Sequence, residues 1–203
     1  MITIDPAAQT DRDNYKLLIG SVIPRPIALV TTLSSEEVLN AAPFSYFSIV
    51  TSNPPMLSLA VARRQGMMKD TARNAIHTGS FVIHMVDESN VELVNKTAAS
   101  LPPDESEVDA SGLTPIASSA IPVPGVREAK IRMECVLERA IELGGTAEQP
   151  ATDLLIGRVV LFHIAEEVYD QGYIAADKLK SVSRMAGNDY ARLGERFELV
   201  RPD

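Results

Sequence analysis

Short apolar runs rich in β-branched residues recur along the chain, and polar or turn-forming residues separate one run from the next. Runs of this length and composition predict β-strands. The run at 130–143 also alternates: Ile131, Met133 and Cys135 fall on one face and charged residues mostly on the other, which predicts a half-buried strand. The strands expected on this basis cover 27–32, 56–62, 80–86, 130–143 and 154–164.

Helical patterns are fewer than strand patterns. The segment 70–79 starts with Asp70 and Thr71, which are helix-capping residue types, and it ends at Gly79. Segments 88–100 and 187–194 are two further helix candidates. Many strands joined mainly by turns favour a mainly β, closed antiparallel barrel with a few peripheral helices, and a β-sandwich is the alternative.

Length and composition are typical of one globular domain spanning 1–203, because 45% of the 203 residues are hydrophobic and 23% are charged. Residues 101–125 hold five of the thirteen prolines, and we expect them to form a long surface excursion of that domain. The single cysteine, Cys135, excludes an internal disulfide and a cysteine cluster, and we expect no metal site.

The formal net charge of −8 disfavours a nucleic-acid partner, because an acidic surface repels phosphate backbones. The first residues, MITIDPAAQTDRDNY, lack the basic start and apolar run of a signal peptide. The most apolar stretch, 154–165, is too short to span a bilayer and is interrupted by Arg158 and His163. We therefore expect a cytoplasmic protein that binds neither nucleic acid nor membranes.

Residues 40–55, NAAPFSYFSIVTSNPP, combine small residues with three aromatic ones. The low bulk of 41–43 would let a flat heterocycle approach the backbone, and Asn40 and Ser45 add side-chain donors and acceptors. The aromatic side chains add faces or edges for stacking. The alternative is that the aromatic residues belong to the core and Asn40 caps a turn, since aromatic residues in strands are usually buried.

A basic cluster follows one strand later. Arg63, Arg64 and Lys69 precede the helix start at Asp70 in a chain that is acidic overall. Basic side chains beside the N–H groups of a helix N-terminus make a good phosphate site, and a solvated basic turn with a plain helix cap is the alternative. A flat-ring segment and a phosphate site joined by one strand predict a mononucleotide-like ligand.

These motifs, in this order, resemble a known family. RPIALVTT, NAAPFSYFSIVTSNPP and KDTARN resemble the flavin reductase-like, FMN-binding split-barrel family, which includes flavoredoxin-like proteins. Later blocks at 106–115, 133–145, 156–164 and 183–202 are similar as well, so the resemblance covers nearly the whole chain. It implies an antiparallel split β-barrel and FMN as the cofactor.

The resemblance also implies the site residues. The flavin ring and ribityl chain would lie along Thr31, Thr32, Asn40, Ala42, Pro43, Ser45, Tyr46 and Phe47. The phosphate would be held by Arg63, Lys69, Thr71 and Asn74. Asp70 would cap the helix or orient Lys69, because a carboxylate repels phosphate. Arg184 would approach from the C-terminal segment, and a surface ion pair with Glu166 or Asp189 is its alternative.

Two departures from the family pattern affect these assignments. The turn before Asn40 carries Glu36 and Glu37 where Asp-Gly is common, and we expect a different turn because glutamate disfavours a positive φ. The block LKSVSRMAG lacks the usual proline before the step to Arg184, which leaves the placement of that arginine open.

The implied activity is that of an NAD(P)H-dependent flavin reductase, in which NADH or NADPH binds transiently and gives a hydride to the flavin. The chain has no Gly-x-Gly-x-x-Gly fingerprint, so the nicotinamide would bind over the flavin and not in a Rossmann domain. His163, late in a predicted strand, is the one candidate for a catalytic side chain, and a core histidine is the alternative.

Two other functions compete with the reductase. One is an FMN-binding electron-transfer or flavin-carrier protein of the same fold without efficient NAD(P)H turnover, and the other is a binding module that has lost the flavin. The resemblance further implies a homodimer with FMN near the interface. It also implies a monooxygenase or another electron acceptor as the partner.

Overall fold

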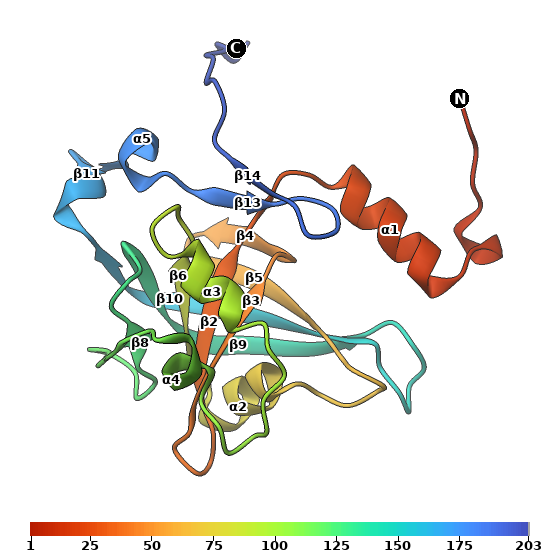
Figure 1. Ribbon diagram of the computed structural model, residues 1–203, viewed down its shortest axis with the longest axis horizontal. Coiled ribbons are helices and arrows are strands. Elements are labelled where there is room, and N and C mark those ends of the chain that lie inside the picture. Colours follow the sequence, from red (N-terminus) through yellow and green to blue (C-terminus); the bar gives the residue numbers. More distant parts are fainter. Residues whose placement is uncertain (203) are drawn as a thin grey trace.

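The structure, a computed structural model, describes residues 1–202. Its centre is one seven-stranded antiparallel sheet with the strand order β3-β2-β6-β9-β10-β5-β4 (Figure 1). The strands of this sheet are β2 (Ala28–Leu33), β3 (Leu39–Phe44), β4 (Phe47–Ser52), β5 (Pro55–Ala62), β6 (Ser80–Met85), β9 (Ile131–Leu143) and β10 (Thr152–Ile164).

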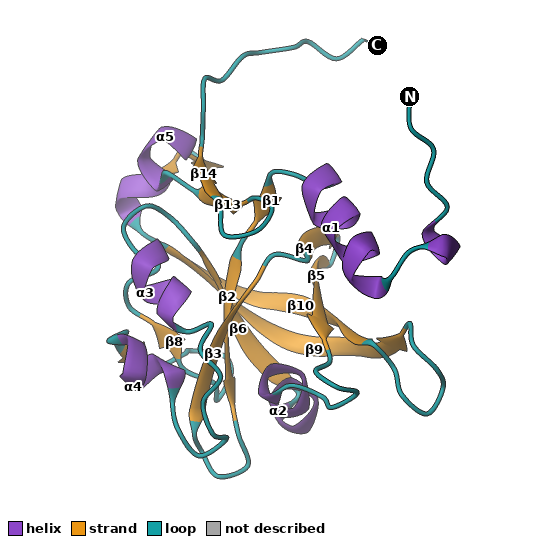
Figure 2. Cartoon of the chain, turned by 45° about the vertical axis from the view of Figure 1, so that its right-hand side comes forward, coloured by secondary structure: helices purple, strands orange, loops and turns teal. Residues whose placement is uncertain are grey.

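The sheet curls into a split barrel. Strand β3, at one end of the strand order, contacts β5 near the other end without forming a ladder with it. The long hairpin of β9 and β10, 13 residues in each strand, runs across the barrel (Figure 2). The expectation of an antiparallel split barrel is confirmed, and the β-sandwich alternative is wrong because these strands form a single sheet.

Smaller sheets and helices surround the barrel. The short strands are β1 (Arg25–Pro26), β13 (Val182–Arg184) and β14 (Tyr190–Arg192) in one sheet, β7 (Pro115–Ile116) with β8 (Gly125–Val126), and β11 (Tyr169–Asp170) with β12 (Tyr173–Ile174). The helices are α1 (Asp11–Ser21), α2 (Asp70–Thr78), α3 (Val91–Lys96), α4 (Glu107–Ser111) and α5 (Ala176–Leu179), with 3-10 turns at Pro6–Ala8 and Glu166–Val168.

Strand β2 separates two hydrophobic cores. Ala28 and Val30 point into the barrel core, while Ile27 and Leu29 point into a second core beneath α3 and α4. Successive side chains of a strand face opposite sides, so a strand buried on both faces must be apolar throughout. This explains why 27–30 is a continuous apolar run and does not alternate.

The five predicted strands are all present, and so is the helix predicted at 70–79, which ends with Gly79 in the left-handed conformation. The helix expected over 88–100 is shorter, as α3. The helix expected at 187–194 is wrong: Gly187 has a φ of 59° and turns the chain, so that β14 pairs with β13. Helix α1 was missed, although Thr10 caps it by accepting from the Asp13 N–H at 3.2 Å.

The turn between β2 and β3 corrects a second expectation. Glu37 adopts a φ of 61°, the left-handed conformation that we expected glutamate to avoid. The Ser34 hydroxyl accepts hydrogen bonds from the Glu36 and Val38 N–H groups at 3.2 and 3.0 Å. These bonds hold the turn against a conformational cost of about 1–2 kcal/mol for a residue with a side chain.

The segment 101–125 is less of a surface loop than its prolines predict. It contains α4 and β7, and Val108, Leu113 and Val123 are buried. Among residues 1–202, no helix is long and apolar enough to cross a membrane.

Candidate functional site

Two neighbouring clefts meet at the end of β3. One has a volume of about 310 Å³ and the other of about 470 Å³, and Pro43, Phe44 and Lys69 line both. Strand β3 is the edge of the main sheet, paired only with β2. An edge strand carries backbone N–H and C=O groups that are free to bind a ligand. The small residues of this strand therefore lie beside the clefts, as the sequence predicted.

The smaller cleft, of about 310 Å³, lies among three parts of the chain that are distant in sequence. Ser45 and Tyr46 come from the β3–β4 connection, Tyr15 from α1, and Arg184 from β13. Burial of the Tyr46 phenol raises its pKa. Phe47 lies outside this cleft and packs against the barrel core, so for Phe47 the alternative of a core aromatic holds.

Arg25, which the sequence analysis missed, holds the walls of this cleft together. Its guanidinium donates to the Ile19 and Val22 carbonyls of α1 and its cap at 2.7 and 2.6 Å. It also donates to the Met185 carbonyl at 2.8 Å and to the Ser45 hydroxyl at 3.3 Å. Arg25 is 6% exposed, so these bonds compensate the burial of its charge. No local pattern identifies it, because one partner lies 160 residues away.

The larger cleft, of about 470 Å³, lies at the N-terminus of α2. Lys69 is the N-cap residue of this helix and makes no side-chain cap hydrogen bond. Arg64 and Arg73 also line the cleft. The expectation that Asp70 caps α2 or orients Lys69 is wrong. Asp70 instead forms an ion pair with Arg73, one helical turn later. Lys69 thus lies beside first-turn N–H groups and the positive end of the helix dipole, an arrangement that suits a phosphate.

Asn40 belongs to a buried hydrogen-bond network. Its Oδ1 accepts from the Thr32 and Thr71 hydroxyls, each at 3.2 Å. Its Nδ2 donates to Glu107 Oε2 at 2.9 Å, and Asn74 Nδ2 donates to Thr32 at 3.4 Å. These bonds fix the amide orientation and tie β3 to α2 and α4. Asn40 borders the larger cleft, but most of its hydrogen-bonding capacity is used within the protein.

Glu107 is a second residue that the sequence analysis missed. Its Oε2 also accepts from the Ala41 N–H at 3.2 Å, so the carboxylate also binds the backbone of the edge strand β3. Burial raises the pKa of Glu107, and hydrogen bonds from Ala41 and Asn40 act in the opposite direction. Glu107 and Asn40 are separated by 67 positions in the sequence, so no local pattern could have linked them.

Several residues expected at the site lie elsewhere. Thr31 donates to the Pro124 carbonyl at 2.7 Å on the other face of β2, and Thr32 and Asn74 are buried within the network around Asn40. Arg63 donates to Asp153 at 3.0 and 2.7 Å and also pairs with Glu142. The structure does not bring Arg63 to either cleft; its neighbour Arg64 lines the larger one.

His163 does not line either cleft. Its Nε2 lies 2.6 Å from Glu134 Oε1 on the outer face of the sheet. The fully buried Glu134 also accepts from the Ser119 and Ala120 N–H groups, each at 2.7 Å, and these bonds offset the burial and leave its pKa lowered. His163 therefore anchors the loop over β9, and the proposed catalytic role for it has no support in its position.

Arg184 lines the smaller cleft, as the resemblance implied for a residue of the C-terminal segment. Its guanidinium lies 4.5 Å from the centre of the Tyr190 ring, and its Nη2 donates to the Gly187 carbonyl at 2.5 Å. No ion pair joins it to Glu166 or Asp189 among the described residues, so that alternative is wrong. The hairpin of β13 and β14 holds its side chain beside Pro43 and Ser45.

The donor set of the two clefts suits a flat heterocycle that carries a phosphate. Cations and a helix N-terminus lie at one end, around Lys69, while small residues, an open strand edge and aromatic side chains lie along Ala42 to Tyr46. Both features meet at Pro43 and Phe44, so one ligand can contact both.

Comparisons with known proteins agree with this geometry. The family model of the flavin reductase like domain matches residues 19–183. The chain is 56% identical over 193 residues to the uncharacterized protein YwrF of Bacillus subtilis, with 94% of each chain covered. The crystal structure of nitrilotriacetate monooxygenase component B from Bacillus cereus matches with a TM-score of 0.97 and 61% identity, covering 98% of each chain.

A more distant solved structure has the same fold. It is the 2-nitrobenzoate 2-nitroreductase NbaA of Pseudomonas fluorescens, with a TM-score of 0.89 and 33% identity, covering 99% of this chain and 96% of that one. The family match, the curated relative and the split barrel agree with one another. The chain belongs to the flavin reductase-like family of split-barrel proteins.

Proposed function

We propose that this protein is an NAD(P)H-dependent flavin reductase that binds FMN in the two clefts at the end of β3 and supplies reduced flavin to a monooxygenase partner. One observation carries the proposal: Lys69 and the N-terminus of α2 form a cationic end to a space that continues along the open edge of β3. Family membership supports a flavin as the ligand.

In this proposal the two ends of the space bind different parts of FMN, the phosphate at one end and the ring at the other. Lys69, Arg64 and the first-turn N–H groups of α2 hold the phosphate by charge-assisted hydrogen bonds. Backbone carbonyl groups on the outer edge of β3, that of Pro43 among them, meet the polar edge of the ring, and Ser45 adds a hydroxyl, since the Ala41 N–H is engaged by Glu107 and proline has no N–H. Thr71 contributes its backbone N–H, since its hydroxyl is engaged by Asn40.

Bound FMN supplies the hydride-accepting chemistry. The protein contributes binding, orientation and exclusion of water. Arg184 provides a fixed positive charge beside Pro43 and Ser45, held by the Tyr190 ring and the Gly187 carbonyl. Fixed charge of this kind stabilises negative charge on a reduced ring. No protein acid or base is assigned, because His163 lies away from both clefts.

The monooxygenase partner is proposed from similarity. A solved structure that is 61% identical to this chain is that of a component B of nitrilotriacetate monooxygenase. We propose that this chain likewise serves a separate oxygenase component. We also propose a homodimer, because Phe197, Leu199 and Val200 extend from the C-terminal strand with more than four-fifths of their surface exposed. Apolar side chains on an extended arm are stabilised when a second copy covers them.

The absorption spectrum of the purified protein, before and after anaerobic addition of NADH and then NADPH, tests the proposal. We expect flavin bands that bleach on mixing with at least one of the two nucleotides. Bands that persist with both would refute the reductase and favour the electron-transfer or carrier alternative. A colourless protein that takes up no added FMN would refute the cofactor assignment itself.

A further inference from the structure

Arg25, in β1, is a buried cation without a counter-ion. It is 6% exposed, and among residues 1–202 no carboxylate oxygen lies within 4.0 Å of its guanidinium. Its four hydrogen-bond acceptors are all neutral: the carbonyls of Ile19, Val22 and Met185 and the Ser45 hydroxyl. A buried charge is usually paired with an opposite charge, because burial removes it from water. The hydrogen bonds of Arg25 replace its lost hydration, but nothing in the protein neutralises its charge.

This charge borders the proposed flavin site. Arg25 lines the smaller cleft together with Ser45 and Tyr46. Burial raises the pKa of the Tyr46 phenol, and the charge of Arg25 acts on that pKa in the opposite direction. The field of Arg25 therefore reaches the side chains that face the cleft.

The Ser45 hydroxyl connects Arg25 with the space of the cleft. Its Oγ accepts from Arg25 Nε at 3.3 Å, and among residues 1–202 its own O–H donates to no protein acceptor. A hydroxyl has one proton to donate, and a bond accepted from a cation directs that proton away from the cation. Hydrogen bonds in a chain polarise one another, so a cationic donor strengthens the O–H of Ser45 as a donor. Ser45 thus offers a polarised donor to a ligand in the cleft.

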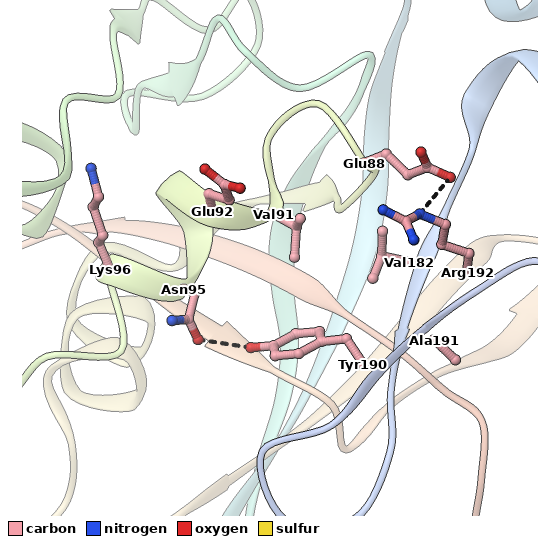
Figure 3. Close-up of a pocket in the computed structure, with 9 residues that line it drawn as sticks. All are labelled: Glu88, Val91, Glu92, Asn95, Lys96, Val182, Tyr190, Ala191 and Arg192. Atoms are coloured by element: carbon pink, nitrogen blue, oxygen red, sulfur yellow. Dashed lines mark hydrogen bonds and ion pairs between the residues drawn. The ribbon is translucent and has the colours of Figure 1, made fainter.

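Arg184, the second arginine of the smaller cleft, has a different environment. Its guanidinium lies 4.5 Å from the centre of the Tyr190 ring, whose face carries partial negative charge. The Tyr190 hydroxyl donates to Asn95 Oδ1 at 2.9 Å, and the two side chains point toward each other between β14 and α3 (Figure 3). Arg184 is only partly buried, whereas Arg25 is buried. Water and salt screen a buried charge less, so the charge of Arg25 acts more strongly on a nearby group.

We propose that Arg25 is a positioning residue for the flavin, which holds the Ser45 hydroxyl as a donor toward an acceptor atom of the ring. This inference rests on the proposed function. Reduction places negative charge on the ring, and charge near the ring tunes its reduction. That negative charge is the counter-charge that Arg25 lacks within the protein, so the interaction is stronger with the reduced ring. Arg25 and Ser45 together therefore raise the reduction potential of bound FMN.

The midpoint potential of bound FMN, measured by dithionite titration against a reference dye, tests the inference without nicotinamide or turnover. Ser45→Ala removes the donor and should weaken binding of reduced FMN about tenfold relative to oxidised FMN. A tenfold change lowers the two-electron potential by about 30 mV. Ser45→Thr keeps a hydroxyl and should stay close to the wild-type potential. Ser48→Ala, at an exposed serine of β4 that lines neither cleft, is the matched control and should leave the potential unchanged.

Arg25→Lys tests whether the arginine acts through the serine. Lysine keeps the charge but has its donors on one atom, so it cannot reproduce the fork that reaches all four acceptors. Arg25→Lys and Ser45→Ala should each lower the potential, and the double variant should fall no further than the lower of the two. Additive shifts would show that the two residues act separately and would overturn the positioning role. If urea unfolding shows that Arg25→Lys does not fold, the Ser45 variants decide the inference.

Failure of the proposed function would look different from failure of this inference. An unchanged potential in Ser45→Ala, or an equally lowered one in Ser45→Thr, would overturn the inference while the protein still binds FMN and reacts with a nicotinamide. Flavin bands that bleach with neither NADH nor NADPH would refute the reductase, yet the dithionite titration would still decide on Arg25 and Ser45. A protein that takes up no FMN would overturn both.

Discussion

At the scale of the single residue, Lys69 differs from other cationic side chains near the clefts, because among the described residues its side chain has neither an internal hydrogen bond nor an ion pair. Arg63 is engaged by two carboxylates, Arg73 by Asp70, and Arg25 by four oxygen atoms. Lys69 caps α2 without a side-chain hydrogen bond of its own and takes part in no ion pair among residues 1–202. It is therefore the cation that an incoming phosphate can engage without breaking an internal contact.

Lys69→Ala should weaken FMN binding more than riboflavin binding. Hydrogen bonds to charged groups contribute about 1.5–3 kcal/mol, so the dissociation constant for FMN should rise roughly 10- to 100-fold. Riboflavin has no phosphate and should lose little affinity. Fluorescence titration with both flavins measures the difference. Equal losses for the two flavins would show that Lys69 does not contact the phosphate.

His84 is a second residue with a measurable consequence. It is fully buried in β6, its Nε2 accepts from the Val126 N–H at 2.9 Å, and its Nδ1 therefore donates to the Leu29 carbonyl at 3.0 Å. Both ring nitrogens are satisfied in the neutral form. Burial lowers the pKa of His84 to about 4 from an ordinary value of 6.5.

The protein should lose stability on acidification because of His84. Between pH 6.5 and about 4 the unfolded chain binds a proton at this histidine and the folded chain does not. The contribution to the free energy of unfolding is complete above pH 6.5 and falls by about 3 kcal/mol as the pH drops to 4. NMR titration should show a His84 ring that stays neutral down to pH 5. A midpoint near 6.5 for that ring would contradict the assignment.

At the scale of the element, the β9–β10 hairpin depends on a glycine. The register of β10 against β9 shifts between Ile156 and Gly157. A Cβ atom at Gly157 would lie 2.4 Å from Cζ of the buried Phe81 and 3.2 Å from Cβ of Cys135. The absence of a side chain at this position lets the strand pass close to the barrel core at its bulge.

Gly157→Ala should destabilise the fold by about 1–3 kcal/mol, because Phe81 must leave its packed position. Gly20→Ala is the matched control: it sits within α1, and apart from the adjacent residues and the backbone of that helix no atom lies within 4 Å of its added Cβ. In a helix the same substitution stabilises by up to about 1 kcal/mol. Urea unfolding should thus move the two midpoints in opposite directions. A Gly157→Ala midpoint at or above that of the wild type would contradict the close packing.

At the scale of the whole molecule, both chain ends extend from the barrel as arms (Figure 1). Met1 and Ile2 at one end, and Phe197 and Leu199 at the other, are largely exposed. We predict that light scattering gives twice the 22.0 kDa mass of one chain, and that truncation after Leu193 weakens the dimer. A mass of one chain at micromolar concentration would contradict the proposed homodimer.

Local patterns predicted much of the fold. Alternation and β-branched composition identified five of the seven strands of the main sheet, but not β3 and β4. Gly79 marked the end of α2. These features depend on neighbours within a few residues. The same patterns failed at 187–194, where pairing with β13 decided the structure. They also missed α1, whose Thr10 cap is local but whose helix buries only Ile19.

The sequence by itself determined that small residues, aromatic residues and a cationic helix start follow one another along 40–74, and this order was enough to identify the family. Only the tertiary structure decided which side chains face the clefts: Arg64 and not Arg63, Glu107 from a distant helix, and Tyr190 beside Arg184. The physical reason is that the direction of a side chain depends on strand register and on partners up to 160 residues away, and neither is encoded in local periodicity.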